Sequence, residues 1–205
     1  MDSIIFDLDG TLWDPIDSVL EAWNKVILGN RRVQHGITRD HLEGTMGLQI
    51  KEIGKILFPE LDEEGREQLL KELSQHEIPH LRERGGRLYD HVEDVLIELS
   101  KKYKLFIVSN CQDGYIESFY AFHGLDKHFI DYENPGRTGL SKSENIKLIM
   151  ERNNLKKAVY VGDTEGDQKA AKDAGIPFVY AAYGFGQAGT YEYKIESFEE
   201  LLDMF

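Results

Sequence analysis

The sequence predicts an α/β fold in which a doubly wound (Rossmann-like) parallel sheet forms the core and a small α-helical domain is inserted. First, short continuous apolar runs end at turn residues, which is typical of strands buried on both faces of a parallel sheet. Second, such runs alternate with helical patterns beyond residue 86. Third, residues 29–85 carry helical spacing and no strand-like run. A chain of 205 residues can bury such a core together with an insertion.

The first expected strand is Ile4–Phe6, which ends at Asp7. A helix with a single apolar stripe follows, and the stripe is formed by Ile16, Val19, Leu20, Trp23, Val26 and Ile27. Only helices are expected in the rest of the insertion, where Gly29-Asn30, Pro59 and Gly85-Gly86 mark breaks. The predicted domains are therefore an α/β core of residues 1–14 and 86–205 and a helical cap of residues 15–85.

Strands and helices alternate through the remainder of the chain. Further strands are expected at 105–108, 158–161 and 177–181, with a short apolar run at 129–130. The helices between and after them carry the apolar positions of residues 92–99, 115–122, 146–150, 170–174 and 198–202. Gly175 is expected to cap the C-terminus of the helix that precedes it.

The composition excludes several classes of function. With 24 Lys and Arg against 37 Asp and Glu, the formal charge is −13, which disfavours nucleic acid and membrane surfaces as partners. No stretch approaches the roughly 20 apolar residues of a membrane span, and the N-terminus lacks a basic signal-peptide region. The single cysteine, Cys111, precludes an intrachain disulfide and fits a reducing compartment. We therefore expect a cytoplasmic protein that is a monomer by default, with Cys111 as a small buried residue or, alternatively, a peroxide-sensitive thiol.

Polar residues follow three of the expected strands, at the edge of the sheet where ligands bind. Asp7 and Asp9 follow the first strand, Ser109 and Asn110 follow another, and Asp163 and Asp167 follow a third. Four carboxylates in one crevice would repel one another and raise their pKa values. A hard divalent cation such as Mg2+ resolves this repulsion, because it takes oxygen ligands.

The spacing of Asp7 and Asp9 lets both carboxylates face one pocket at the end of a strand. One can then act as a nucleophile while the other handles protons. Thr11 and Ser109 add hydroxyl groups, and Lys142 adds a positive charge for a phosphoryl oxygen or a carboxylate.

These motifs resemble those of the haloacid dehalogenase-like hydrolase superfamily. The segment Ile5–Leu12 resembles its first motif, Ser109-Asn110 its second, Lys142 its third and Gly162–Asp167 its fourth, in the order of the family. The helical insertion resembles the small cap of the branch that contains phosphoglycolate phosphatase and β-phosphoglucomutase. The resemblance extends over about residues 4–186.

The resemblance implies a role for each matching residue. Asp7 would attack phosphorus to give an aspartyl-phosphate, and Asp9 would exchange protons with the leaving alcohol and with water. Mg2+ would be bound by the Asp7 carboxylate, the backbone carbonyl of Asp9 and Asp163, with Asp167 close behind. The phosphoryl oxygens would be held by Thr11, Ser109 and Lys142, with Asn110 beside them.

The resulting prediction is a Mg2+-dependent phosphatase that acts on a small phosphorylated metabolite, such as phosphoglycolate or a sugar phosphate. Asp9 favours phosphoryl chemistry, because dehalogenases of the family lack an acid at its position. A phosphomutase and a non-catalytic binding module are the alternatives. Lys142 lacks the proline that commonly follows it in the family, so Lys147 competes for its role. Lys142 is preferred because it lies at the start of the expected helix, whereas Lys147 lies a turn further along. The segment 43–48 is either a substrate loop or a plain turn between helices.

Overall fold

A six-stranded parallel sheet lies at the centre of the structure, and its strands follow the order β5-β4-β1-β6-β7-β8. The computed structural model describes residues 1–33 and 35–205. The strands are β1 (Ser3–Phe6), β4 (Lys104–Val108), β5 (Phe129–Glu133), β6 (Ala158–Gly162), β7 (Phe178–Ala181) and β8 (Tyr193–Ile195). Strands are added first on one side of β1 and then on the other, so the strand order reverses between β1 and β6. The predicted doubly wound α/β fold is confirmed.

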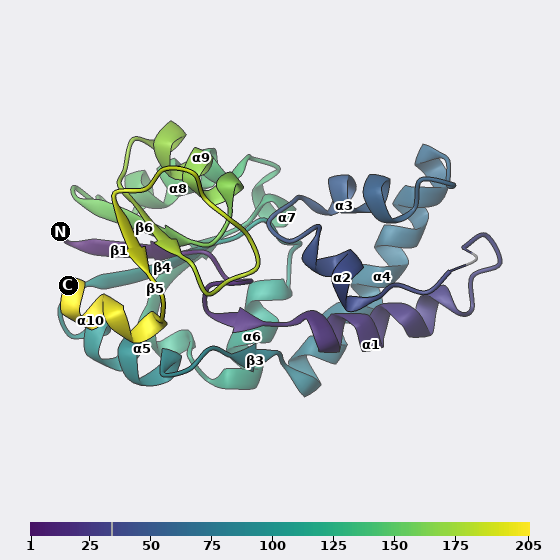
Figure 1. The fold of residues 1–205 in the computed structure, drawn as a ribbon, viewed down its shortest axis with the longest axis horizontal. Coiled ribbons are helices and arrows are strands. Elements are labelled where there is room, and N and C mark those ends of the chain that lie inside the picture. The colour runs from purple at the N-terminus through teal and green to yellow at the C-terminus, as the bar shows by residue number, and fades with distance from the viewer. Residues whose placement is uncertain (34) are drawn as a thin grey trace.

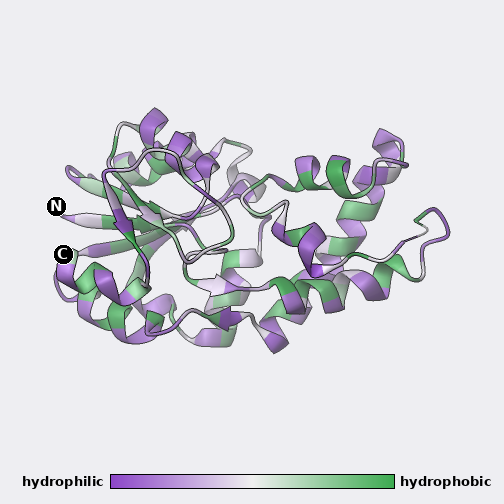
Figure 2. Cartoon of the chain, viewed as in Figure 1, coloured by the Kyte–Doolittle hydropathy of each residue, from purple (hydrophilic) through white to green (hydrophobic). Residues whose placement is uncertain are grey.

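Alternate residues of the central strands pack into two separate layers of the core. In β1, Ile4 and Phe6 belong to one buried cluster, whereas Ile5 belongs to the other. The first cluster is covered by α5 (Val92–Ser100), α6 (Tyr115–His123) and α10 (Leu201–Met204). The second is covered by α8 (Lys142–Arg152) and α9 (Glu165–Ala174). Figure 1 shows these helices on opposite sides of the sheet, and Figure 2 shows that they carry both hydrophobic and hydrophilic sides.

The helical insertion, residues 15–85, extends away from the sheet to the right of Figure 1. Its helices are α1 (Ile16–Ile27), α2 (Arg39–Glu43), α3 (Ile50–Leu57) and α4 (Glu63–Arg84). The described part of the insertion contains helices and no strand, as the sequence predicts. The predicted stripe of α1 is buried at Ile16, Val19, Trp23 and Ile27. Helix α4 packs against α1 within the insertion and also against α6 of the core.

A short antiparallel ribbon joins the insertion to the core. It consists of β2 (Trp13–Asp14) and β3 (Arg87–Leu88). Arg39 of α2 stabilises this junction, because its guanidinium donates hydrogen bonds of 2.5–2.9 Å to Asp14, Asp17 and Glu43. The ribbon was not predicted, because two-residue strands carry no readable periodicity.

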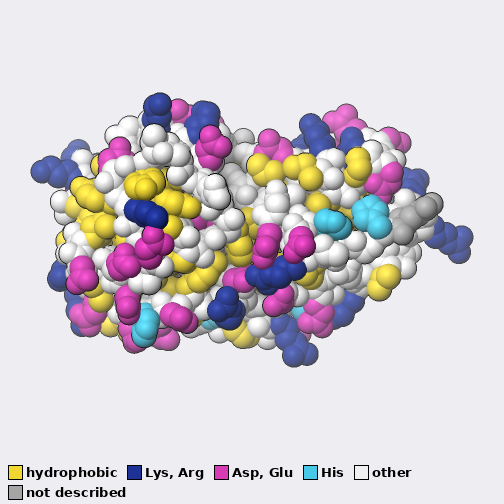
Figure 3. Space-filling model, viewed as in Figure 1, with side chains coloured by type: hydrophobic (Ala, Val, Ile, Leu, Met, Phe, Trp, Pro, Cys, Tyr) yellow, Lys and Arg dark blue, Asp and Glu magenta, His cyan; other side chains and the backbone are white. Residues whose placement is uncertain are grey.

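The structure adds other short elements that the sequence patterns did not indicate. These are β8, α7 (Pro135–Thr138) and the 3-10 helix η1 (Asp126–His128). The expected terminal helix is present as the 3-10 helix η2 (Phe198–Glu200) followed by α10. The predicted C-cap is confirmed, since Gly175 ends α9 in the left-handed conformation. No helix in the described ranges has both the length and the apolarity required to cross a membrane. Acidic and basic side chains are interspersed over the face shown in Figure 3.

Candidate active site

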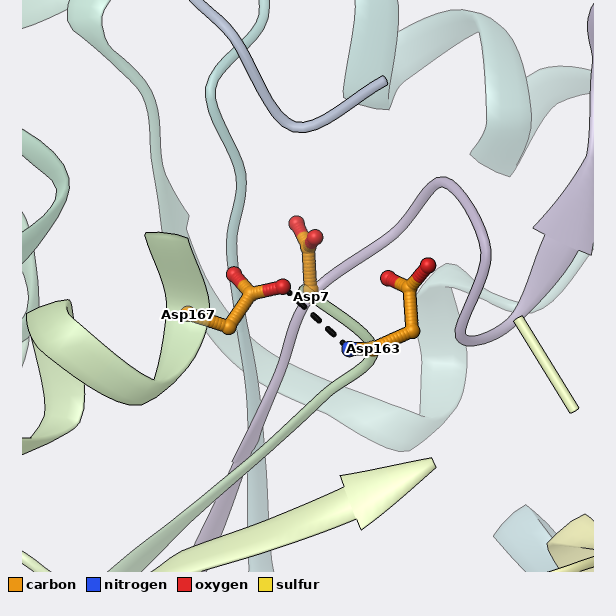
Figure 4. Close-up of side chains that lie close together, drawn as sticks. All are labelled: Asp7, Asp163 and Asp167. Carbon is orange, nitrogen blue, oxygen red and sulfur yellow. Dashed lines mark hydrogen bonds between the residues drawn. The ribbon is translucent and has the colours of Figure 1, made fainter. Parts of the chain in front are cut away.

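Three carboxylates meet at the edge of the sheet where β1 and β6 end side by side. Asp7 directly follows β1, Asp163 directly follows β6, and Asp167 lies in the first turn of α9. One oxygen from each lies within 4.8 Å of the others. Figure 4 shows the three side chains and the hydrogen bond of 3.2 Å from the Asp163 backbone N–H to Asp167. The reversal of strand order brings these carboxylates together, since ligand sites of doubly wound sheets form at this point.

Lys142, at the start of α8, is the cation beside this triad. Its Nζ lies 3.2 Å from Asp7 Oδ2 and 2.6 Å from Asp167 Oδ1. The side chain is only 5% exposed, whereas Lys147 on the same helix is exposed. Three carboxylates and one ammonium, all ionised, leave two negative charges uncompensated. A divalent cation would restore neutrality.

The pKa values of the triad show the same imbalance. Burial and the neighbouring Asp167 raise the pKa of Asp7 by more than Lys142 lowers it. Burial, Asp167 and Asp7 together raise the pKa of Asp163 well above its ordinary value. Burial alone would raise the pKa of Asp167, but Lys142 and Thr164 hold it below its ordinary value. Lys142 therefore compensates only part of the negative charge that the three carboxylates carry when they are ionised.

The oxygen atoms of the triad fit a metal ion. Within the described residues, Asp7 Oδ1 and Asp163 Oδ1 are buried and have no hydrogen-bond partner. The other oxygen of Asp163 accepts the N–H groups of Phe185 and Gly186 at 2.8 and 3.2 Å. Buried carboxylate oxygens need a donor or a cation, and all-oxygen sites suit hard divalent ions. The residues present could therefore hold a divalent metal.

Asp9 lies apart from the triad, although it lines the same cavity as Asp7. Its Oδ1 accepts the indole N–H of Trp13 at 2.6 Å and the hydroxyl of Tyr115 at 3.1 Å. Burial raises the pKa of Asp9 to about 6, even though these two hydrogen bonds lower it. The two carboxyl groups of the first motif therefore have different surroundings. Such a difference separates nucleophilic from acid–base roles.

The remaining predicted site residues, Ser109, Asn110 and Thr11, differ in their contacts and in whether they line the cavity. Ser109 is buried at the end of β4 and lines the cavity together with Asn110. The amide of Asn110 donates to the carbonyl oxygen of Gly47 at 2.8 Å, so this residue contacts the insertion. The hydroxyl of Thr11 is buried without a hydrogen-bond partner in the described chain, but Thr11 does not line the cavity.

The cavity lies between the core and the insertion and has a volume of about 50 Å³. The insertion contributes Thr45, Met46, Gly47 and Leu48 from the segment considered as a substrate loop. Gly47 has φ +81°, and a Cβ there would lie 3.0 Å from Cγ2 of Thr164. The segment thus packs against the start of α9 and covers the site.

Cys111 also lines this cavity, and it is buried. Burial, with Asp9 and Asp7 nearby, raises the pKa of its thiol well above the ordinary value. A neutral thiol is a poor nucleophile toward peroxide, so the structure favours the small buried residue over the reactive thiol.

Glu77 of α4 is a site residue that the sequence analysis missed. It is 3% exposed and lines the cavity, with Oε2 accepting Trp23 Nε1 at 3.0 Å and Gln112 Nε2 at 2.8 Å. Burial and the proximity of Asp9 raise its pKa to about 7, although both hydrogen bonds lower it. A signal was present in the sequence, because Glu77 is flanked at four-residue spacing by buried Leu73 and Leu81.

The sequence and the fold are similar to those of known proteins. The sequence matches the family described as haloacid dehalogenase-like hydrolase over residues 4–181. A phosphoglycolate phosphatase of Vibrio parahaemolyticus is 28% identical over 222 residues, covering 98% of this chain and 94% of the relative.

Two solved structures show the likeness of fold. A predicted phosphoglycolate phosphatase from Haemophilus somnus superposes with a TM-score of 0.87 at 19% identity, covering 100% of this chain and 97% of the other. A β-phosphoglucomutase from Clostridium difficile gives 0.75 at 18% identity, covering 98% and 93%. Since the family match extends over most of the sequence, with the carboxylate triad inside it, the chain belongs to the haloacid dehalogenase-like hydrolase family.

Proposed function

We propose that this protein is a Mg2+-dependent phosphatase that hydrolyses a small phosphorylated metabolite through an aspartyl-phosphate. The observation that carries the proposal is the difference in surroundings between two carboxyl groups that line one cavity. Asp7 lies beside an ammonium and within the triad, whereas Asp9 lies outside the triad and is held by two neutral donors, Trp13 and Tyr115. Asp7 is therefore suited to attack, and Asp9 to carry a proton.

In the first half-reaction, a carboxylate oxygen of Asp7 attacks the phosphorus atom. The new Asp7–phosphorus bond forms as the bond from phosphorus to the leaving oxygen breaks. Protonated Asp9 donates its proton to that oxygen, so the leaving group departs as an alcohol. Trp13 and Tyr115 hold the Asp9 carboxyl in place, since both donate to Oδ1.

In the second half-reaction, water attacks the phosphorus of the aspartyl-phosphate. Asp9, now a carboxylate, takes a proton from the water, and the bond from phosphorus to Asp7 breaks. Inorganic phosphate is released and Asp9 returns to its protonated form, so the cycle closes. Segment 43–48 excludes other water from the site while it covers the cavity.

The residues that would hold Mg2+ are Asp7, Asp163 and Asp167, together with the backbone carbonyl of Asp9. When bound, the ion supplies charge neutralisation for the carboxylates and for the phosphoryl oxygens. Lys142 would add its positive charge to the phosphoryl group, and the hydroxyl groups of Thr11 and Ser109, with Asn110 beside them, would orient it. We also propose that residues 15–85 act as a cap over a core of residues 1–14 and 86–205.

A phosphomutase is less well supported by the cavity. A mutase must hold a substrate with a second phosphate, or hand a phosphate back to a phosphorylated sugar. Among the described residues that line the cavity there is no Lys, Arg or His to receive such a group. The relatives named phosphoglycolate phosphatase also favour hydrolysis.

The proposal is tested by phosphate release from a panel of phosphomonoesters with Mg2+, with EDTA, and with the Asp7→Asn variant. The variant keeps the shape of the side chain but removes the nucleophile, so turnover should fall by more than about 10³-fold. Asp173→Asn, an exposed change on α9, is the matched control and should leave turnover unchanged.

Turnover in the Asp7→Asn variant within tenfold of wild type would refute the proposed nucleophile. Activity that requires a bisphosphate activator would indicate a mutase. A wild-type protein that is stabilised by Mg2+ but releases no phosphate from any ester would be a binding module.

A further inference from the structure

Glu77 holds a carboxyl group at the side of the cavity formed by the helical insertion. Both of its hydrogen bonds reach Oε2, one from Trp23 of α1 and one from Gln112 of the core. The carboxyl is thus fixed from both parts of the molecule. The hydroxyl of Ser118 in α6 donates to the carbonyl oxygen of Ile78 at 3.1 Å, so the backbone next to Glu77 is also bound to the core.

Packing alone gives little reason for an acid at this position. Leu73 and Leu81, one helical turn to either side of Glu77, are both 0% exposed. Burying a carboxyl group among them costs free energy unless partners compensate for it. A third apolar residue would complete the buried stripe of α4 but would leave the indole N–H of Trp23 without an acceptor. A neutral amide oxygen could accept that N–H, so the hydrogen bond does not itself require an acid. The chemical environment of the cavity supplies a different reason.

Among the described residues, the cavity is lined by acids, neutral polar groups and apolar side chains, and by no cationic side chain. Asp7, Asp9 and Glu77 line it, and none of the lining residues that the structure describes is Lys, Arg or His. Lys142 lies beneath it, where it is paired with Asp7 and Asp167 at the phosphoryl end. A carboxylate on the leaving group would therefore face acids with no counter-ion.

We propose that Glu77 is a specificity residue that selects phosphomonoesters whose leaving alcohol bears a hydrogen-bond donor, such as a hydroxyl or ammonium group, and no negative charge. This inference rests on the proposed phosphatase function and narrows its substrate class. The donor would bind the Glu77 carboxyl while the phosphoryl group lies at Asp7.

The test compares kcat/KM for phosphoethanolamine, glycerol 3-phosphate and phosphoglycolate in wild type and in Glu77→Gln. p-Nitrophenyl phosphate serves as a general phosphatase substrate. The wild type should prefer each of the first two esters over phosphoglycolate by at least tenfold. In Glu77→Gln the ratio of phosphoethanolamine to phosphoglycolate should fall at least tenfold, because the amide keeps the shape but loses the charge. A ratio measured on one preparation is independent of the fraction of folded enzyme.

Glu83→Gln, an exposed change on the same helix, is the control and should leave the ratio unchanged. Preference of the wild type for phosphoglycolate, or a ratio within twofold of wild type in Glu77→Gln, would overturn the role of Glu77. Either result would leave the phosphatase intact, as p-nitrophenyl phosphate hydrolysis would show. Absence of hydrolysis of all four esters would overturn the proposed function and this inference with it.

Discussion

Lys142→Met should destabilise the fold strongly, because it removes the one ammonium from a buried group of acids. Lys142 contacts Asp7 and Asp167 at 3.2 and 2.6 Å, and all three side chains are 5% exposed or less. Removal of one partner from a buried ion pair typically costs about 3–5 kcal/mol of unfolding free energy. We expect a loss in this range at pH 8 in EDTA, when the carboxyls are most fully ionised.

The loss should shrink as the pH falls. Without Lys142, Asp7 and Asp167 lose the cation that lowers their pKa values, so both pKa values rise in the folded protein. The folded variant then binds more protons than its unfolded form, so its stability increases as pH falls through the folded-state pKa values. Each carboxyl that takes up a proton can recover about 1.4 kcal/mol per pH unit. In wild type, the pKa of Asp167 lies below its ordinary value, so this residue contributes stability that is lost as the pH falls.

Urea unfolding, followed by tryptophan fluorescence at pH 8 and pH 5.5, measures both effects. Lys147→Met on the exposed face of the same helix is the control, and its change should stay within about 0.5 kcal/mol. A loss for Lys142→Met below about 1 kcal/mol at pH 8, or one that does not diminish at pH 5.5, would refute the ionic account of the triad.

Two further predictions concern Asp9 and Gly47. Tyr115→Phe removes a hydrogen-bond donor that lowers the pKa of Asp9, so the pKa of Asp9 should rise. Because protonated Asp9 acts as the acid, the alkaline limb of the pH profile of kcat/KM should move to higher pH. An alkaline limb that does not move would contradict the role of Asp9 as the acid. Gly47→Ala places a Cβ at φ +81° and 3.0 Å from Thr164, so we expect about a tenfold rise in KM from a strain of about 1–2 kcal/mol. Gly189→Ala, where the added Cβ meets no atom within 4 Å, is the control, and equal KM values would refute the contact.

Much of the fold could be predicted because the central strands are buried on both faces. Runs such as Ile4–Phe6 and 158–161 are continuous and apolar for this reason, and both lie in the sheet. By contrast, β8 is an edge strand with Tyr193 and Lys194 exposed, and it carries no such signal. The two-residue strands β2 and β3 depend on their mutual pairing, which local sequence does not specify.

Some residues of the candidate site could likewise be predicted from the sequence, whereas others could not. Asp7, Asp163 and Ser109 could be placed from the sequence, because parallel strands deliver their C-terminal residues to one edge of the sheet. The choice of Lys142 over Lys147 followed from its position at the helix start, and the structure has Lys142 beside Asp7. The spacing of Leu73 and Leu81 could have marked Glu77 as a buried acid, but its place at the cavity could not be predicted, because the helix face that reaches the cavity depends on how α4 packs against α1 and α6.

Helix α4 has a consequence for how the protein can be divided and recombined. It packs on both α1 and α6, and its adjacent residues Glu77 and Ile78 bond Trp23 of α1 and Ser118 of α6, so it belongs to the insertion and to the core alike. A deletion of residues 15–85, or their exchange for the cap of a relative, would remove the helix against which α6 buries Ser118. Chimeras joined at these boundaries should expose an apolar face of α6 and aggregate. Recombination between relatives should succeed when α4 and α6 are inherited together.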